Sequence, residues 1–217
     1  MHEPLLELKA ALETCFAGQV YFTAFWHEYP PDAPPACSAE PCMENLRDLV
    51  VAQHFYNFSL WHMEDEARRT DVDDSAIADC KRAIDALNQK RSDAIEAVDR
   101  CLVSILEPLL PKNATLRQNT ETAGMAVNRL SILALKTYHM EEQTRRRDVS
   151  VDHIRACTGK LDILNRQRRD LAKAVLELIA DYAVGFKVPV LYSQFKMYND
   201  PTLNPALYGQ AARPGKG

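Results

Sequence analysis

The chain has 217 residues, of which 47% are hydrophobic and 26% charged, and its formal net charge at pH 7 is −4. This composition is typical of a globular protein, and the small negative charge gives no general attraction to nucleic acid or to an anionic membrane, so neither is expected as a partner. No apolar run approaches the roughly 18 residues of a membrane span, and Glu3, Glu7 and Glu13 stand where a signal peptide would be basic or apolar. We therefore expect a cytoplasmic protein whose six cysteines are mostly reduced thiols.

Long helices with few turns are indicated by only seven glycines and by prolines that are concentrated in the connections. The predicted fold class is all-α. Short turns with capping residues begin at Asp71 and Asp148, and Asn119 or Thr120 can cap the helix that precedes the second turn. The expected elements, in chain order, are a helix over Pro4–Trp26, a Pro-rich loop with Cys37 and Cys42, a helix over Met43–Thr70, a helix from the first turn to Leu109, a helix from about Asn119 to Arg147, a helix from the second turn to Val184, and an irregular strap over Phe186–Gly217.

The chain contains an internal repeat without gaps, in which His62–Val98 aligns with His139–Val175 at a constant offset of 77. Sixteen of the 37 aligned positions are identical, whereas chance would give roughly two or three. Two tandem helical hairpins predict an up-down-up-down four-helix bundle in which duplicated residues meet across a pseudo-twofold axis. We expect one helical domain over 1–217, made of an N-terminal helix and loop (1–42), two hairpins (43–110 and 118–184) and the strap (185–217).

One arginine interrupts the apolar seam on the second helix of each hairpin: Arg91 in the first copy and Arg168 in the second. A guanidinium in a packed seam must be paired, because an isolated buried charge costs many kcal/mol. The candidate partners on the same helices are Asp85 and Asn88, with their repeat mates Asp162 and Asn165.

The first helix of each hairpin carries two neighbouring polar stripes, and the pattern does not decide which one faces the centre. One stripe contains His62 and Asp65, with mates His139 and Glu142, and the other contains His54, Asn57 and Glu64, with Glu141 as the mate of Glu64. Counting back from the turns at 1.5 Å per residue places the histidines, acids, asparagines and arginines in one axial zone roughly 15 Å long. The duplicated polar residues are therefore predicted to form one site.

Several separate strings carry a family resemblance: His54–Arg68, Asn88–Asp93, Asn119–Gly124, Arg129–Met140 and Gln194–Pro201. They span about residues 43 to 208 and resemble the bacterial family catalogued as domain of unknown function 4254. The resemblance implies a cytoplasmic bacterial protein and brings no activity. Ser92 and Asn128 stand where the resemblance implies Asn and Asp.

Three interpretations of the duplicated residues stay open. In the first, they form a purely structural ionic network in a protein-interaction module. In the second, which we favour as a function, they bind a small anionic metabolite, phosphorylated or sugar-linked, through paired guanidiniums. The residues expected to bind this ligand are Arg91, Arg168, Asn57, His54, Asn88, Asn165, Asp85 and Asp162, together with Lys196, Tyr198 and Asn199 if the strap closes over the site.

The third interpretation is a di-metal bundle enzyme with His62, Asp65, His139 and Glu142 as ligands. If the protein is an enzyme, His62 and His139 are the expected proton-transfer groups, with Glu64 and Glu141 orienting them. The sequence does not decide whether the protein is an enzyme, implies no particular cofactor, and leaves a homo-oligomer open. Cys37 and Cys42 have no second Cys pair or histidine at ligand spacing, so we do not expect them to bind a metal.

Overall fold

The computed structural model describes residues 3–115, 117–193, 195, 197 and 200–208. No strand occurs among these residues, and the helices pack against one another as a bundle, so the predicted all-α class is confirmed. The elements are α1 (Glu3–Glu28), α2 (Met43–Glu66), α3 (Asp74–Leu106), the 3-10 turn η1 (Glu107–Leu109), α4 (Ala123–Arg145), α5 (Val151–Ala183) and the short α6 (Pro205–Tyr208).

Side-chain caps fix where the helices of the two hairpins begin. Asp73 caps α3 and Ser150 caps α5, each accepting a hydrogen bond from the backbone N–H three residues later, as the turn sequences predict. The cap of α4 is Thr122, rather than Asn119 or Thr120, so this helix begins later than expected. The helices α3 and α5 both have 33 residues and begin and end 77 residues apart, in keeping with the repeat in the sequence.

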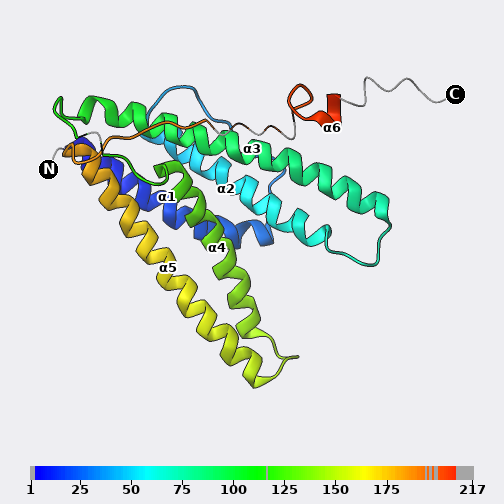
Figure 1. Cartoon of the computed structure of the whole chain (residues 1–217). Coiled ribbons are helices and arrows are strands. Elements are labelled where there is room, and N and C mark those ends of the chain that lie inside the picture. The colour runs from blue at the N-terminus through cyan, green and yellow to red at the C-terminus, as the bar shows by residue number, and fades with distance from the viewer. Residues whose placement is uncertain (1–2, 116, 194, 196, 198–199, 209–217) are drawn as a thin grey trace.

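The two hairpins, α2–α3 and α4–α5, diverge from one end of the molecule toward their turns, and α1 runs along the angle between them (Figure 1). Contacts from α1 to α2, α4 and α5 make it the fifth helix of the bundle. Away from the common end, each hairpin becomes a separate two-helix arm. The polar residues near the turns therefore have fewer packing neighbours than a closed four-helix bundle would give them.

The main apolar core lies where all five long helices converge. It includes Leu8 and Leu12 of α1, Leu46 and Val50 of α2, Val98 and Leu102 of α3, Val127 and Leu130 of α4, and Val175 and Ile179 of α5. A smaller cluster, formed by Trp26, Phe58 and Leu135 with partly buried aromatics around them, lies farther along α1, α2 and α4. This second cluster supports the histidines described below.

A buried carboxylate joins α3 to the start of α4. Asp99 accepts hydrogen bonds from the Thr122 hydroxyl at 2.5 Å and from the backbone N–H of Gly124 at 2.6 Å. Burial raises the pKa of Asp99 to about 6, although both hydrogen bonds act in the opposite direction. A Cβ at Gly124 would lie 2.7 Å from the Asp99 carboxyl carbon, so only glycine fits this close approach.

After α5 the chain turns back along the connection before α4. Gly185 has a φ of 72°, a left-handed conformation that suits glycine, and its carbonyl accepts from the Thr115 N–H at 2.8 Å. The Val188 N–H donates to the Arg117 carbonyl at 3.0 Å, so this part of the predicted strap is attached to the body. Within the described residues, no helix combines the length and the apolarity needed to cross a bilayer.

Candidate functional site

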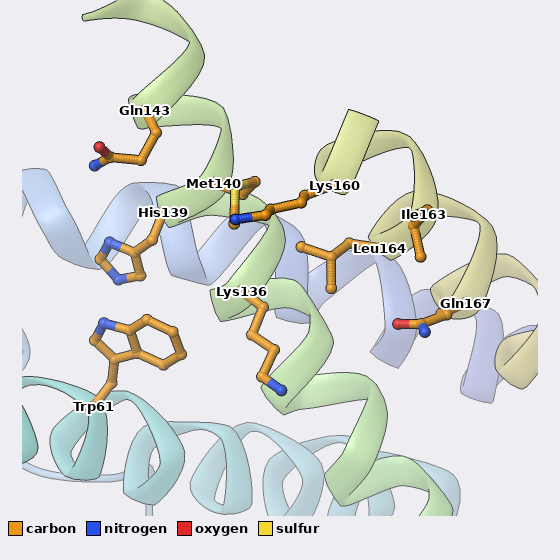
Figure 2. A pocket seen from close by; sticks show the side chains of 9 residues that line it. All are labelled: Trp61, Lys136, His139, Met140, Gln143, Lys160, Ile163, Leu164 and Gln167. Atoms are coloured by element: carbon orange, nitrogen blue, oxygen red, sulfur yellow. The ribbon is translucent and has the colours of Figure 1, made fainter. Parts of the chain in front are cut away.

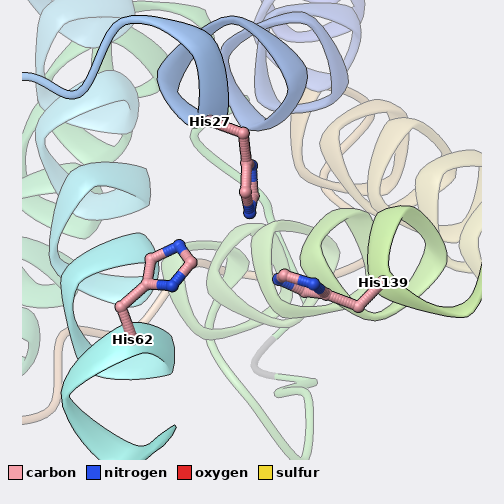
Figure 3. Close-up of side chains that lie close together, drawn as sticks. All are labelled: His27, His62 and His139. Atoms are coloured by element: carbon pink, nitrogen blue, oxygen red, sulfur yellow. The ribbon is translucent and has the colours of Figure 1, made fainter. Parts of the chain in front are cut away.

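Three histidines from three helices meet beside the smaller aromatic cluster. His27 lies near the end of α1, His62 on α2 and His139 on α4, and their rings point toward one another (Figure 3). One ring nitrogen from each histidine lies within 4.8 Å of the other two. No other group of three or more His, Cys, Asp or Glu side chains in the described residues is arranged to hold a metal ion.

In this histidine cluster, the Nδ1 atoms of two rings, those of His27 and His139, make hydrogen bonds. His27 donates from Nδ1 to the Thr23 carbonyl at 2.6 Å, and His139 donates from Nδ1 to the Glu142 carboxylate at 2.9 Å. The Nε2 atoms of His27, His62 and His139 are buried and have no hydrogen-bond partner among the described residues. Because a carbonyl or carboxylate oxygen can only accept, a neutral ring with its proton on Nδ1 leaves the Nε2 lone pair free.

Aromatic rings surround the histidine cluster. Tyr138 stacks on His27 with ring centroids 4.1 Å apart, and Trp61 stacks on His139 at 4.6 Å with an interplanar angle of 5°. Phe58 contacts the edge of His62 at 4.5 Å. Burial lowers the pKa of His62, and the neighbouring His27 and His139 act in the same direction. The environment therefore favours the neutral imidazole of His62, the form that can bind a metal.

A pocket of about 360 Å³, here called the Arg91 pocket, lies between α2, α3 and α4. The Nε of Arg91 is buried without a hydrogen-bond partner in the described part of the chain, and burial lowers the pKa of this guanidinium. Its lining is mixed: Leu60, Trp61, Ile132 and Leu135 are apolar or aromatic, whereas Asn57, Glu64, Asp65, Arg68, Asn88 and Arg91 are polar or charged. Five residues predicted to form a site, Asn57, Glu64, Asp65, Asn88 and Arg91, are thus brought together.

A second pocket, of about 540 Å³, lies between α4 and α5, and Trp61 separates it from the Arg91 pocket (Figure 2). His139, Met140 and Leu164 line it, and Trp61 reaches it from α2, so Trp61 contributes to both pockets. Its two cations, Lys136 and Lys160, are exposed. This pocket therefore has no buried cationic group comparable to Arg91.

His54, predicted to bind ligand, is a completely buried core residue. Its Nδ1 lies 2.7 Å from the Ser131 hydroxyl and its Nε2 lies 3.1 Å from the Thr23 hydroxyl, so both nitrogens have partners. Burial, assisted by the charge of Arg168, lowers the pKa of His54 to about 3. Asn57 joins the same network through Nδ2, which donates to Ser131.

The expected pairing of the seam arginines with acids on their own helices does not form. Asp85 pairs with Lys81, and the exposed Asp162 does not line the Arg91 pocket. Arg168 donates from Nη2 to the Phe16 carbonyl of α1 and is absent from the Arg91 pocket, as is Asn165 on the same helix. The two guanidiniums therefore do not clamp one ligand in this pocket.

The expected orientation of the histidines by Glu64 and Glu141 is also not what the structure shows. Glu64 pairs with Arg68 at 2.7 Å and Glu141 pairs with Arg145 at 2.5 Å, whereas Glu142 is the carboxylate that accepts from His139. Asp65, the mate of Glu142, lines the Arg91 pocket and is not part of the histidine cluster. Lys196, Tyr198 and Asn199, the predicted contacts of the strap, lie outside the described residues.

Sequence reasoning missed His27, because this residue lies outside the duplicated segment. The only local signal was the aromatic stretch that precedes it, since Phe22 and Trp26 indicate that this end of α1 is buried against other helices. Nothing in that stretch identifies the two duplicated histidines as the groups that His27 contacts.

The fold and the two candidate sites define an all-helical protein with a histidine cluster between α1, α2 and α4 and with the Arg91 pocket between α2, α3 and α4. Residues 47–190 match the model of the family described as protein of unknown function (DUF4254), and the chain belongs to this family. No curated protein and no solved structure matches the chain.

Proposed function

We propose that the protein binds a small organic anion in the Arg91 pocket. The observation that carries the proposal is the buried Nε of Arg91, which has no hydrogen-bond partner among the described residues and belongs to a guanidinium that lines the pocket. A buried donor without a partner costs free energy, and a bound carboxylate would satisfy it with a charge-assisted hydrogen bond. A pocket of about 360 Å³ is large enough for a ligand of about monosaccharide size.

The charges that line the pocket favour an anion with a single negative charge. Glu64 is paired with Arg68, which leaves Arg91 and Asp65 as the lining charges without an ion pair in the described structure. A phosphate ester would bring up to two negative charges close to two carboxylates, whereas a carboxylate brings one. We therefore favour a sugar acid over a sugar phosphate within the predicted class of phosphorylated or sugar-linked metabolites.

The remaining lining suits the body of such a ligand. Trp61 and Leu135 offer apolar surface to the face of a sugar ring, and Asn57 and Asn88 add polar atoms to the lining of the same pocket. The purely structural network loses support at Arg91, because its expected partner Asp85 pairs with Lys81 instead. A di-metal carboxylate centre loses support as well, since the metal-competent group in the described residues contains histidines alone.

Isothermal titration calorimetry of the full chain with glucuronate, glucose 6-phosphate and glucose tests the proposal. We expect glucuronate to bind more tightly than glucose 6-phosphate, and neutral glucose to bind least. Arg91→Met should weaken glucuronate binding by at least about 10-fold, because it removes the cation but keeps much of the side-chain volume. Arg168→Met, the same change at the repeat-equivalent position outside the pocket, is the matched control and should leave the affinity unchanged.

Two results would count against the proposal. If neither anion binds at millimolar concentration, the pocket is not an anion site. If glucose 6-phosphate binds more tightly than glucuronate, the pocket takes anions but the charge argument for a monoanion is wrong. A cytoplasmic location and a bacterial origin stay predictions.

A further inference from the structure

In the histidine cluster, three buried ring nitrogens have no hydrogen-bond partner among the described residues. In the neutral form, His27 and His139 keep their protons on Nδ1, because Nδ1 donates to the Thr23 carbonyl and to Glu142 respectively. Their Nε2 lone pairs, and the partnerless Nε2 of His62, then lie buried together. Buried polar atoms are nearly always satisfied, and leaving one unsatisfied costs about 1–3 kcal/mol, so three at one point require an explanation.

A metal cation explains all three at once. From the convergence of these nitrogens we infer that His27, His62 and His139 bind one divalent transition-metal ion per chain, most suitably Zn²⁺. A cation accepts three lone pairs simultaneously, whereas a water molecule can donate only two hydrogen bonds and would need the third ring to act as a donor. Neutral imidazole is a common ligand of Zn²⁺, and three protein ligands leave a fourth coordination position for a water molecule or another small ligand.

The geometry needs only a small adjustment to hold the ion. Nitrogens at the corners of a triangle with 4.8 Å sides lie ~2.8 Å from its centre, and that separation is the upper limit for the three histidines. Binding Zn²⁺ at 2.0–2.1 Å in tetrahedral geometry would draw each nitrogen inward by at most ~0.9 Å. Rotations of the three side chains can supply this movement, since each ligand comes from a different helix and no two compete for the same backbone.

Two of the histidines donate a hydrogen bond from Nδ1 to an oxygen atom, as metal-binding histidines commonly do. A backbone carbonyl holds Nδ1 of His27 and a carboxylate holds Nδ1 of His139, which fixes the ring orientation and makes Nε2 a better ligand. The carboxylate is exposed on its outer side, with 47% of the Glu142 side chain accessible, so it can be removed without opening the core. The rings of Tyr138 and Trp61 stack on His27 and His139 and hold these two imidazoles from the side.

The experiment uses the full chain, prepared without an affinity tag and treated with EDTA to remove metal. Zn²⁺ is titrated by calorimetry, and Co²⁺ is titrated by visible absorption, because the d–d bands of tetrahedral cobalt report the coordination geometry. We expect one equivalent of each ion per chain. His27→Ala, His62→Ala and His139→Ala should each weaken Zn²⁺ binding by more than about 100-fold, a larger effect than loss of a supporting group has.

Two controls separate this site from other ligands in the chain. His153→Ala removes an exposed histidine on α5 that contacts Cys157 and should change neither the stoichiometry nor the affinity. The exposed thiols Cys37 and Cys42 could also bind Co²⁺, but thiolate ligands would produce ligand-to-metal charge-transfer bands in the near ultraviolet. Such bands, with binding unchanged in the three histidine variants, would assign the metal to cysteine and overturn the inference.

If a histidine variant does not fold, Glu142→Ala still tests whether the histidine cluster binds the metal. This change removes the carboxylate that orients His139, and we expect it to weaken Zn²⁺ binding about 10- to 100-fold while the melting temperature of the metal-free protein changes little. Absence of Zn²⁺ binding at micromolar concentration by the folded, wild-type chain would also overturn the inference. The metal site and the anion pocket fail separately, because Arg91→Met should keep metal binding and His27→Ala should keep glucuronate binding.

Discussion

His54 and His62 lie on the same helix, about two turns apart, yet their surroundings differ. His54 is completely buried and uses both ring nitrogens, on Ser131 and on Thr23. His62 is partly buried, and its Nε2 meets two other imidazoles without a hydrogen-bond partner in the described chain. His54 lies near the middle of α2, whereas His62 lies four residues before the end of this helix, on the part that leads to the turn of its hairpin.

This difference shows that residue type alone does not distinguish a structural histidine from a candidate ligand. What distinguishes them is the hydrogen-bonding capacity that remains after the protein's own partners are counted. The same criterion separates Asp99, whose carboxylate has two donors, from Arg91, whose Nε has no partner among the described residues. Groups with partners should therefore matter mainly for stability, and groups without them mainly for binding.

The largest effect should come from His54→Ala, which removes two buried hydrogen-bonding contacts and leaves a cavity. We expect it to lower the free energy of unfolding by about 3–5 kcal/mol. His62→Ala removes a ring whose Nε2 has no hydrogen-bond partner among the described residues, and it should cost less than about 2 kcal/mol in the metal-free protein. Urea denaturation measures the free energy of unfolding of both variants. Equal losses would show that His54 and His62 contribute equally to stability and would contradict the comparison.

Asp99 should make the stability of the protein depend on pH. Its folded pKa of about 6 lies above the ordinary value of 3.8, so the folded state binds more protons between these two values. The contribution of Asp99 to the free energy of unfolding is therefore largest below pH 4. It falls by up to about 3 kcal/mol as the pH rises through 6. Asp99→Asn should remove this part of the slope, measured as unfolding free energy from pH 4 to pH 7. A slope identical to that of the wild type would show that Asp99 is not its source.

Gly124→Ala tests the close packing of α4 against Asp99 and the α3 backbone by adding a methyl group there. The new Cβ would lie 2.7 Å from the Asp99 carboxyl carbon and 2.8 Å from the Ile95 carbonyl, which is backbone and cannot move aside cheaply. We expect a loss of about 1–3 kcal/mol. Gly159→Ala is the matched control on α5, where nothing lies within 4 Å of the added Cβ, and it should stabilise the protein by up to about 1 kcal/mol. Thermal melting of both variants should move in opposite directions.

The smallest effect is expected at the seam arginines. Arg168→Met removes a hydrogen bond to the Phe16 carbonyl and should cost about 1 kcal/mol. Arg91→Met removes a guanidinium whose buried Nε has no hydrogen-bond partner among the described residues, so the stability of the ligand-free protein should hold or rise slightly. A loss at Arg91 larger than that at Arg168 would indicate that Arg91 has a structural role.

The fold was largely predictable because its signals are local. Few glycines, prolines at the connections and capping residues at the turns gave helices within a few residues of those observed, and Thr122 replaced the predicted caps of α4. The duplicated histidines His62 and His139 were predicted to meet and do so, with ring centroids 5.9 Å apart. The angle between the hairpins was not predictable, since it depends on how α1 packs between them.

The partners within the site were predicted less well, for reasons of helical spacing. Asp85 and Arg91 are six residues apart, which places them on different faces of α3, whereas Lys81 lies four residues from Asp85 on the same face. In the same way Glu142, three residues after His139, reaches its ring, and Glu141, two residues after, does not. His27 could not be predicted, because its contact with the other two histidines is purely tertiary.

The presence of three histidines in the histidine cluster has a consequence for symmetry. His62 and His139 are equivalent by the 77-residue offset, so two separate copies of one hairpin could in principle present the same pair. A twofold-symmetric dimer of hairpins would supply any further ligand in duplicate, giving two or four nitrogens but never three. A single chain that joins both copies to an unduplicated helix can add the single, non-equivalent nitrogen of His27, so covalent linkage of the repeats allows a centre with three protein ligands.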